Sequence, residues 1–175
     1  MTDEPSLNTR SPVHAIPVEI LGEIFLQYLP VYPVCPPILG DASPAKLGQI
    51  CSHWRNIAHS MPSLWRAVAL MHCGAPPAAK EAELEMAGVW LQRSAPQPVA
   101  VALDVRLFKD EHRTPALELL LAHCERWEHG YLNLHNLDFA AVRKLLRSKL
   151  PLLRQLEVRL LRHANAEGTE LPHPL

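Results

Sequence analysis

PVAVALDV, residues 98–105, decides how the second half of this chain folds. Counted from Pro98, its key positions stand at offsets 0, 3, 5 and 7, and the same spacing recurs in WEHGYLNL (127–134) and LRQLEVRL (153–160). The alternation along these segments predicts short strands at 99–105, 131–134 and 150–160. One spacing found three times indicates a repeated structural unit.

An amphipathic helix is expected before each of these strands. The first covers about 78–93 and has Leu84, Ala87 and Leu91 on one face. In the second, Thr114 is expected to be the N-cap and Pro115 the first helical residue. The core-facing residues of this second helix are Leu117, Leu120, Leu121 and Cys124.

The third helix is expected to begin at Asp138, with Leu137 and Val142 forming a hydrophobic staple. Its inward-facing residues are Val142, Leu145 and Leu146. Strand–helix units that bury their faces only against their neighbours fit repeats of the leucine-rich kind. Pro98 and Gly130 stand where Leu is usual in such repeats, and no unit carries a clean Asn at its turn. The sequence therefore predicts a leucine-rich-repeat-like region at 78–162 and a tail at 163–175.

Composition narrows the function classes. The chain has 175 residues, is 48% hydrophobic, and carries 17 Lys and Arg against 18 Asp and Glu, which gives a net charge of −1. This balance argues against a strong electrostatic hold on nucleic acid or an anionic membrane. No apolar run approaches the roughly 20 residues that a membrane-spanning helix needs, and the N-terminus lacks a secretory signal pattern. With four scattered Cys, we expect an intracellular protein of the cytoplasm, the nucleus or both.

The N-terminal part is expected to be a three-helix unit. A tail at 1–11 precedes a first helix over 17–29, and a Pro-rich loop follows at 30–45. A second helix, within AKLGQICSHWRNIAHS (45–60), ends before Pro62, and a short helical turn follows at 62–68. The second helix carries one apolar stripe, made of Leu47, Ile50, Cys51, Trp54, Ile57, Ala58 and Met61.

The first helix, in contrast, carries two apolar stripes. One stripe is formed by Ile20, Ile24 and Tyr28, and the other, about 100° away, by Leu21, Phe25 and Leu29. A unit this small can cover only one of them with its own second helix. Either a partner protein binds the other stripe, or the repeat region or the Pro-rich loop folds back over it.

Three sequence blocks, in the right order, resemble an F-box. The segment 16–30 is similar to the family's first helix (LPxEILxxIFxxLP), 47–58 to its VCKRWRxIA segment, and 62–65 is PSLW. The Pro-rich insertion, WLQRS at 90–94 and RWEH at 126–129 also resemble the large F-box families of mushroom-forming fungi, in which degenerate leucine-rich repeats commonly follow the F-box. The likeness covers about 12–70, and it implies an α+β, mostly α chain with an F-box-like domain at 12–70.

The resemblance implies a substrate-recruiting adaptor of a Skp–cullin–F-box ubiquitin ligase, with no catalytic residues and no cofactor of its own. The F-box would bind the Skp-type adaptor, and the C-terminal repeats would bind a protein substrate. Carried over by position, the expected adaptor contacts are Ile16, Pro17, Ile20, Leu21, Ile24, Leu29, Leu47, Cys51 and Trp54. The alternative is a non-catalytic repeat scaffold, capped by F-box-like helices that have no ligase role and whose Leu21, Phe25 and Leu29 are covered by the chain itself.

The residues offer little for metal binding or nucleophilic catalysis. On one helix, Cys51 faces the core stripe while His53 and His59 face away, so these three side chains do not converge. His72 and Cys73 add neither a His–His pair at i, i+4 nor a CxxC pair. A Cys–His nucleophile would need a positioned base and an oxyanion hole, for which no Gly-rich turn is present. The basic C-terminal third is a solvated surface or a surface for an acidic substrate.

Overall fold

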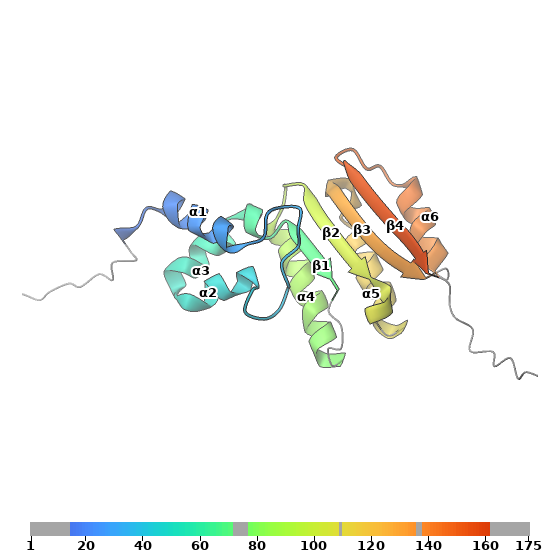
Figure 1. Cartoon of the computed structure of the whole chain (residues 1–175), viewed down its shortest axis with the longest axis horizontal. Helices are drawn as coiled ribbons and strands as arrows, with labels where there is room; N and C mark the ends of the chain where they lie inside the picture. Colours follow the sequence, from blue (N-terminus) through green and yellow to red (C-terminus); the bar gives the residue numbers. More distant parts are fainter. Residues whose placement is uncertain (1–14, 72–76, 109, 136–137, 162–175) are drawn as a thin grey trace, which may run out of the picture.

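The computed structural model describes residues 15–71, 77–108, 110–135 and 138–161. The tails expected at 1–11 and 163–175 lie outside these ranges. The described chain is a mixed structure of helices and a parallel sheet, drawn out so that the N-terminal helices and the last strand lie at opposite ends (Figure 1).

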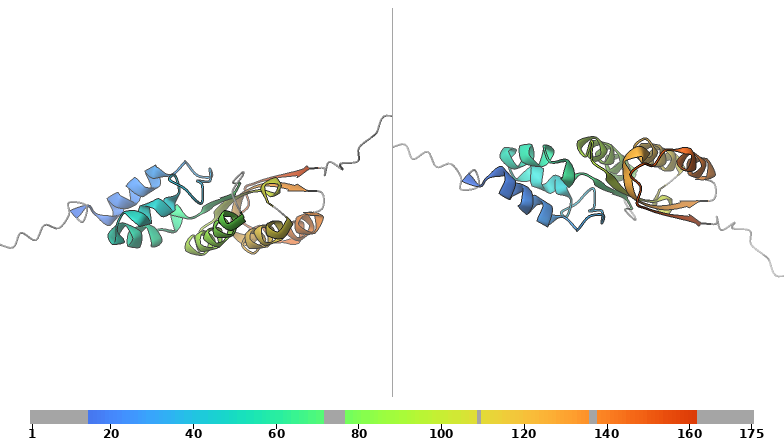
Figure 2. Two further views of the ribbon diagram at one scale, coloured as in Figure 1. Left: turned by 90° about the horizontal axis from the view of Figure 1, so that it is seen from below. Right: turned by 90° about the horizontal axis from the view of Figure 1, so that it is seen from above.

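The sheet has four parallel strands in sequential order. They are β1 (Ala67–Leu70), β2 (Val99–Asp104), β3 (Trp127–His135) and β4 (Gln155–Leu161). The helices that join them in turn are α4 (Pro77–Arg93), α5 (Asp110–Leu121) and α6 (Phe139–Arg147), with short 3-10 turns η4 (Val105–Leu107) and η5 (Cys124–Arg126) between. All three helices cover one face of the sheet (Figure 2), as expected when every crossover has the same hand.

The strand register agrees with the spacing recognised in the sequence at offsets 3 and 5, whereas at offset 0 Trp127 lies opposite Val99 rather than Pro98. Val101 lies opposite Gly130, which lies opposite Leu156, so the three residues at offset 3 form one row. The residues at offset 5 form the next row, which is Leu103, Leu132 and Val158. The spacing is shared because these residues all lie on the helix-facing side of one continuous sheet.

The first strand, β1, was missed by the sequence prediction. The expected helical turn at 62–68 is only the 3-10 turn η3 (Pro62–Leu64), after which the chain becomes extended. Val68 pairs with Val101 and Leu70 with Leu103, so Trp65, Val68 and Leu70 repeat the spacing at offsets 0, 3 and 5. A four-residue strand directly after a helical turn is too short to show the alternation by itself.

The N-terminal helices follow the prediction with one break. Helix α1 (Val18–Tyr28) has the expected bounds, and the short turn η2 (Pro44–Lys46) leads into the second helical segment. That segment divides into α2 (Leu47–Ile50) and α3 (Ser52–His59), because Cys51 between them is extended, with φ −157° and ψ 169°. The Cys51 Sγ accepts a hydrogen bond from the Trp54 N–H at 3.4 Å and so caps α3. The break turns Ile50 outward and leaves it 60% exposed, so its predicted place in the core stripe is wrong.

One hydrophobic core runs through both halves of the molecule. The indole N–H of Trp65, just before β1, donates to the Ala58 carbonyl of α3 at 2.8 Å. The same indole meets Trp90 of α4 edge-on, with ring centroids 5.5 Å apart. The helix α1, the sheet and the helix layer therefore pack as one body rather than as two linked domains.

Two predictions for the later helices are wrong in detail. Helix α5 begins at Asp110, so Thr114 does not cap it and Pro115 lies inside it; the expected core residues of this helix are nevertheless buried. In α6, Leu145 is buried but Leu146 is 76% exposed. Asp138 stands at the N-cap position of α6, but its carboxylate accepts from the His135 N–H at 2.9 Å. Leu137, the staple residue, lies outside the described ranges.

Candidate partner-binding surfaces

One stripe of α1 is buried by the chain itself. Leu21 and Phe25 are 0% exposed, and the Phe25 ring packs against Trp54 of α3 with centroids 4.9 Å apart. Gly22 explains the close approach on this side, because a Cβ there would lie only 3.0 Å from the Met61 methyl carbon. The sequence left open which stripe is internal, and Trp54 and Met61 decide it.

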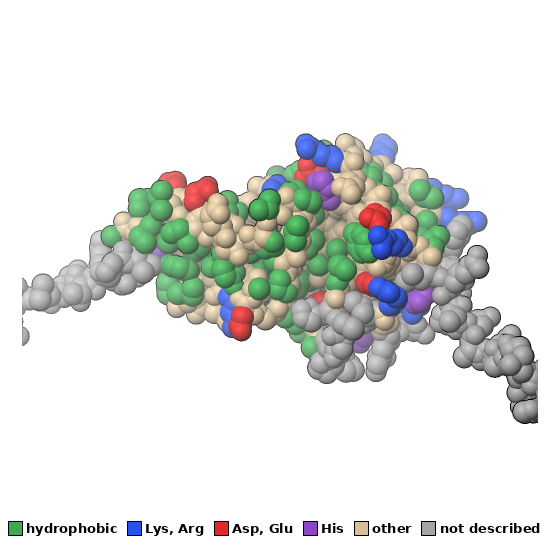
Figure 3. Space-filling view, viewed as in Figure 1, with side chains coloured by type: hydrophobic (Ala, Val, Ile, Leu, Met, Phe, Trp, Pro, Cys, Tyr) green, Lys and Arg blue, Asp and Glu red, His purple; other side chains and the backbone are tan. Residues whose placement is uncertain are grey.

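The other stripe of α1 faces solvent. Ile20, Ile24 and Tyr28 are 53%, 47% and 42% exposed. Figure 3 shows hydrophobic side chains gathered over the N-terminal helices, whereas paired acidic and basic groups lie over the C-terminal strands. Each large apolar side chain left in water forgoes roughly 1.5–3 kcal/mol of burial free energy, and a contiguous exposed patch of this kind marks an interaction surface.

The nine predicted adaptor contacts divide into three groups. Pro17, Ile20 and Ile24 are exposed, while Ile16, Leu29, Cys51 and Trp54 are half-buried. Leu21 and Leu47 are buried against the chain's own residues, so their prediction as surface contacts is wrong. Val18, the first residue of α1, is exposed too, but it lies on the same side of the helix as Phe25 rather than in the exposed stripe.

The Pro-rich loop leaves α1 and folds over the sheet. Tyr32 lies at its centre and donates a hydrogen bond to the Glu128 carboxylate of β3 at 2.9 Å. The Arg66 guanidinium stacks 3.7 Å from the Tyr32 ring centroid, and His129 meets that ring edge-on at 5.7 Å. Burial, together with the Glu128 carboxylate, raises the pKa of Tyr32 well above its usual value. The loop reaches only the end of the exposed stripe, where the Tyr28 hydroxyl donates to the Asp41 carbonyl, and it leaves Ile20 and Ile24 exposed.

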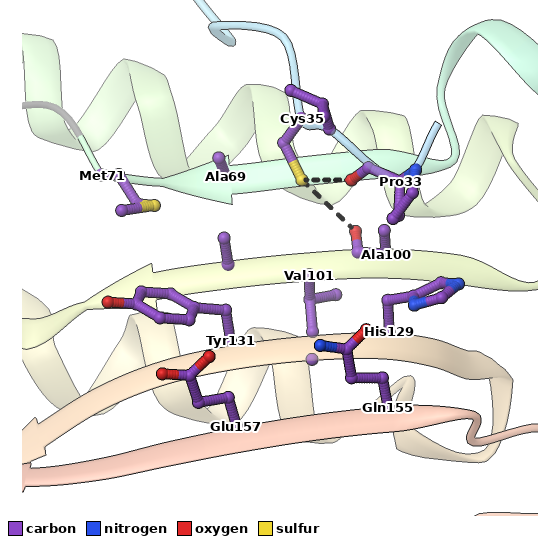
Figure 4. A pocket seen from close by; sticks show the side chains of 13 residues that line it. Pro33, Cys35, Ala69, Met71, Ala100, Val101, His129, Tyr131, Gln155 and Glu157 are labelled. Atoms are coloured by element: carbon purple, nitrogen blue, oxygen red, sulfur yellow. Dashed lines mark hydrogen bonds between the residues drawn. The ribbon is translucent and has the colours of Figure 1, made fainter. Parts of the chain in front are cut away.

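The loop and the open face of the sheet enclose a groove of about 350 Å³, shown in Figure 4. Its floor is made of small side chains, because Ala69 lies opposite Ala102 and Ala100 lies in the neighbouring row of β2. Pro33 and Cys35 of the loop form one wall. Such small residues on the open face make room for the loop on one side and for a ligand beside it.

The opposite wall of the groove is polar. It consists of His129, Tyr131, Gln155 and Glu157. Glu157 pairs with Arg159 at 2.6 Å, and the Arg159 guanidinium lies 5.4 Å from the Tyr131 ring centroid. The His129 Nδ1 atom is buried and has no hydrogen-bond partner among the described residues.

A buried polar cluster supports this wall. The Asn133 side-chain amide donates to Asp104 at 3.0 Å and to the Tyr131 hydroxyl at 3.1 Å. Arg106 donates from Nε to the Asp104 carboxylate at 2.9 Å. The hydrogen bonds from Arg106 lower the pKa of Asp104 to about 2, with a further contribution from Asn133. Through the Asn133 amide, the cluster holds the hydroxyl end of the Tyr131 side chain in place. Its Asp104 carboxylate is charged at neutral pH.

Cys35 is a thiol rather than a nucleophile. Its Sγ lies 3.7 Å from the Pro33 carbonyl oxygen and 4.0 Å from that of Ala100. Burial raises the pKa of Cys35 to about 12, so the reactive thiolate is scarce near neutral pH.

Within the described ranges, no three His, Cys, Asp or Glu side chains gather closely enough to hold a metal ion. His72 and Cys73 lie outside those ranges. None of the helices described is both long and apolar enough to cross a membrane. No protein-family model matches this chain, and no similar protein was found among curated sequences or among solved structures.

Proposed function

We propose that this chain is a substrate-recruiting adaptor of a Skp–cullin–F-box ubiquitin ligase that acts in the cytoplasm, the nucleus or both. Its N-terminal helices would bind the Skp-type adaptor as a three-helix F-box, and its strand–helix units would act as degenerate leucine-rich repeats. The proposal rests chiefly on one observation: a helix whose sequence resembles the F-box first helix leaves Ile20, Ile24 and Tyr28 exposed.

The burial pattern refines the proposed adaptor contacts. The stripe of Ile20, Ile24 and Tyr28 is the centre of the proposed interface, together with the exposed Pro17 and Val18 at the start of the helix. The half-buried residues Ile16, Leu29, Cys51 and Trp54 lie at its margin or support it from beneath. Leu21 and Leu47 act by holding α1 and α2 in place.

The open-face groove is the proposed substrate site. An alanine floor with a polar wall suits a short segment of a protein chain that presents a small apolar side chain between polar groups. The chain would contribute positioning rather than chemistry, because holding the substrate near a ubiquitin-charged enzyme raises the effective concentration of its lysines.

The second candidate is a non-catalytic repeat scaffold with an F-box-like cap. One observation favours it: Leu21 and Phe25 are covered by the chain's own residues, as this alternative expects. The exposure of Ile20 and Ile24 favours the ligase adaptor. Binding of a Skp-type adaptor therefore separates the two functions.

The test is co-purification of the full chain with a Skp-type adaptor after co-expression. Ile20→Asp and Ile24→Asp place a charge on the exposed stripe without touching the core, whereas Leu21→Asp would disrupt folding and is unsuitable. Leu146→Asp is the matched control, since Leu146 is also an exposed apolar residue on a helix but lies at the far end of the molecule.

We expect wild type and Leu146→Asp to retain the adaptor, and both α1 variants to lose it while keeping wild-type circular dichroism. Equal recovery of the adaptor with folded Ile24→Asp, or no recovery with wild type, would reject the ligase role and leave the scaffold.

A further inference from the structure

The outer edge of the sheet offers an unpaired strand. Among the described strands, β4 pairs only with β3. The Arg154 N–H donates to the Glu128 carbonyl at 2.8 Å, so Arg154 faces β3. Backbone groups of successive strand residues alternate in direction, and those of Glu157 and Arg159 therefore point to the free edge. A row of free N–H and C=O groups is a template for another strand.

The sequence of this edge is complementary to itself. Residues 156–160 read LEVRL, with Glu and Arg placed symmetrically about Val158. If two β4 strands run antiparallel about Val158, Glu157 of each chain lies opposite Arg159 of the other. Leu156 then lies opposite Leu160 on the helix-facing side. Opposite charges and apolar pairs directly across two strands both stabilise a sheet.

The backbone pattern agrees with this register. Antiparallel strands alternate between hydrogen-bonded and non-hydrogen-bonded residue pairs. Pairing about Val158 places Glu157 against Arg159 as a hydrogen-bonded pair, and both have edge-facing backbone groups. Val158 meets its own copy as a non-hydrogen-bonded pair, as required for a residue whose backbone groups face β3.

Apolar surface also continues past this edge. Leu160 of β4 is 51% exposed, and Leu156 and Val158 are only partly buried. On α6, Ala140 and Lys144 line the cavity against α5, so Leu146 projects from the opposite side, towards the edge. The helix-facing core of the sheet is therefore open at β4 in the described part of the chain.

We propose that two copies of this chain associate through antiparallel pairing of β4 about Val158. The partner is a second copy because, when the edge strand pairs antiparallel with itself, each Glu157 lies opposite an Arg159. This association is independent of the proposed ligase role, and it leaves the exposed stripe of α1 free, since α1 lies at the other end of the molecule (Figure 1).

The test is sedimentation of the full chain over a range of concentrations, with charge reversals on the edge. Wild type should reach a mass twice the monomer's 19.6 kDa. Arg159→Glu or Glu157→Arg places like charges opposite each other and should weaken self-association at least about tenfold. The two single variants, mixed, restore every opposite-charge pair and should form a heterodimer. The double variant Glu157→Arg/Arg159→Glu should self-associate again.

Glu125→Arg, an exposed charge reversal away from β4, is the control and should behave as wild type. Circular dichroism verifies that each variant is folded. A wild type that stays monomeric up to its solubility limit would overturn the proposal, and would leave residues 162–175 or a different protein as the occupant of the edge. Single variants that associate as well as wild type, or a mixture that stays monomeric, would overturn it as well.

Discussion

Tyr32 and Glu128 are 96 residues apart in sequence, and a hydrogen bond of 2.9 Å joins their side chains. This contact holds one part of the Pro-rich loop on the sheet, while Asp41 of the same loop accepts a hydrogen bond from Tyr28 of α1. Two surfaces follow from this arrangement, because the loop forms one wall of the groove and leaves Ile20 and Ile24 of α1 exposed.

Removing the Tyr32 hydroxyl should loosen the loop. Tyr32→Phe keeps the ring over which Arg66 stacks but deletes a hydrogen bond to a carboxylate, which is expected to cost about 1–2 kcal/mol of unfolding free energy. Denaturant unfolding measures this loss, and thiol labelling of Cys35 in the native protein should become faster. In the Glu128→Ala background, which removes the acceptor, the same change should cost less; equal costs in both backgrounds would mean that the pair does not hold the loop.

Asp104 should make stability depend on pH in the acid range. Its pKa in the folded protein, about 2, lies below the usual 3.8 of an aspartate, so its contribution to stability is complete well above pH 4 and is lost as the pH falls towards 2. Asp104→Asn should lose about 2 kcal/mol at neutral pH, and the difference from wild type should shrink on acidification. Urea unfolding at several pH values tests this, and a constant difference from pH 7 to pH 2 would contradict it.

Placing a Leu at Gly130 should destabilise the protein. A Cβ at Gly130 would lie 2.7 Å from the Leu156 Cδ1 and 3.6 Å from the Trp127 ring. Gly130→Leu should therefore cost about 1–3 kcal/mol through overpacking. Pairing it with Leu156→Ala makes room and should recover part of the loss in thermal unfolding. A stabilised single variant would show that the space on this side is not filled.

The two stripes of α1 should differ sharply in their effect on folding. Leu21→Ala empties a fully buried position and should cost about 2–5 kcal/mol, whereas Ile24→Ala should cost less than about 1 kcal/mol. Denaturant midpoints of the two variants give the comparison. Similar losses would mean that the exposed stripe is packed against another part of the chain.

The spacing shared by the strands could be found in the sequence because the residues buried on one side of each strand are apolar and recur at every second position. Val101, Leu103 and their counterparts face one helix layer, and the offsets between them record it. The internal stripe of α1 could not be predicted in this way, since both stripes are equally apolar and the choice depends on Trp54 and Met61. The groove was hidden for the same reason, because its loop wall depends on the long-range contact between Tyr32 and Glu128.

Only Trp65 and Arg66 separate the turn η3 from β1, and the Trp65 indole is bonded to the Ala58 carbonyl at 2.8 Å. No hinge therefore lies between the helices that carry the exposed stripe and the sheet that carries the groove. The two surfaces are joined through one packed core, so the fold itself sets the distance between them. In a ligase, the distance between these two surfaces would then decide which lysines of a bound target lie within reach of the ubiquitin-charged enzyme.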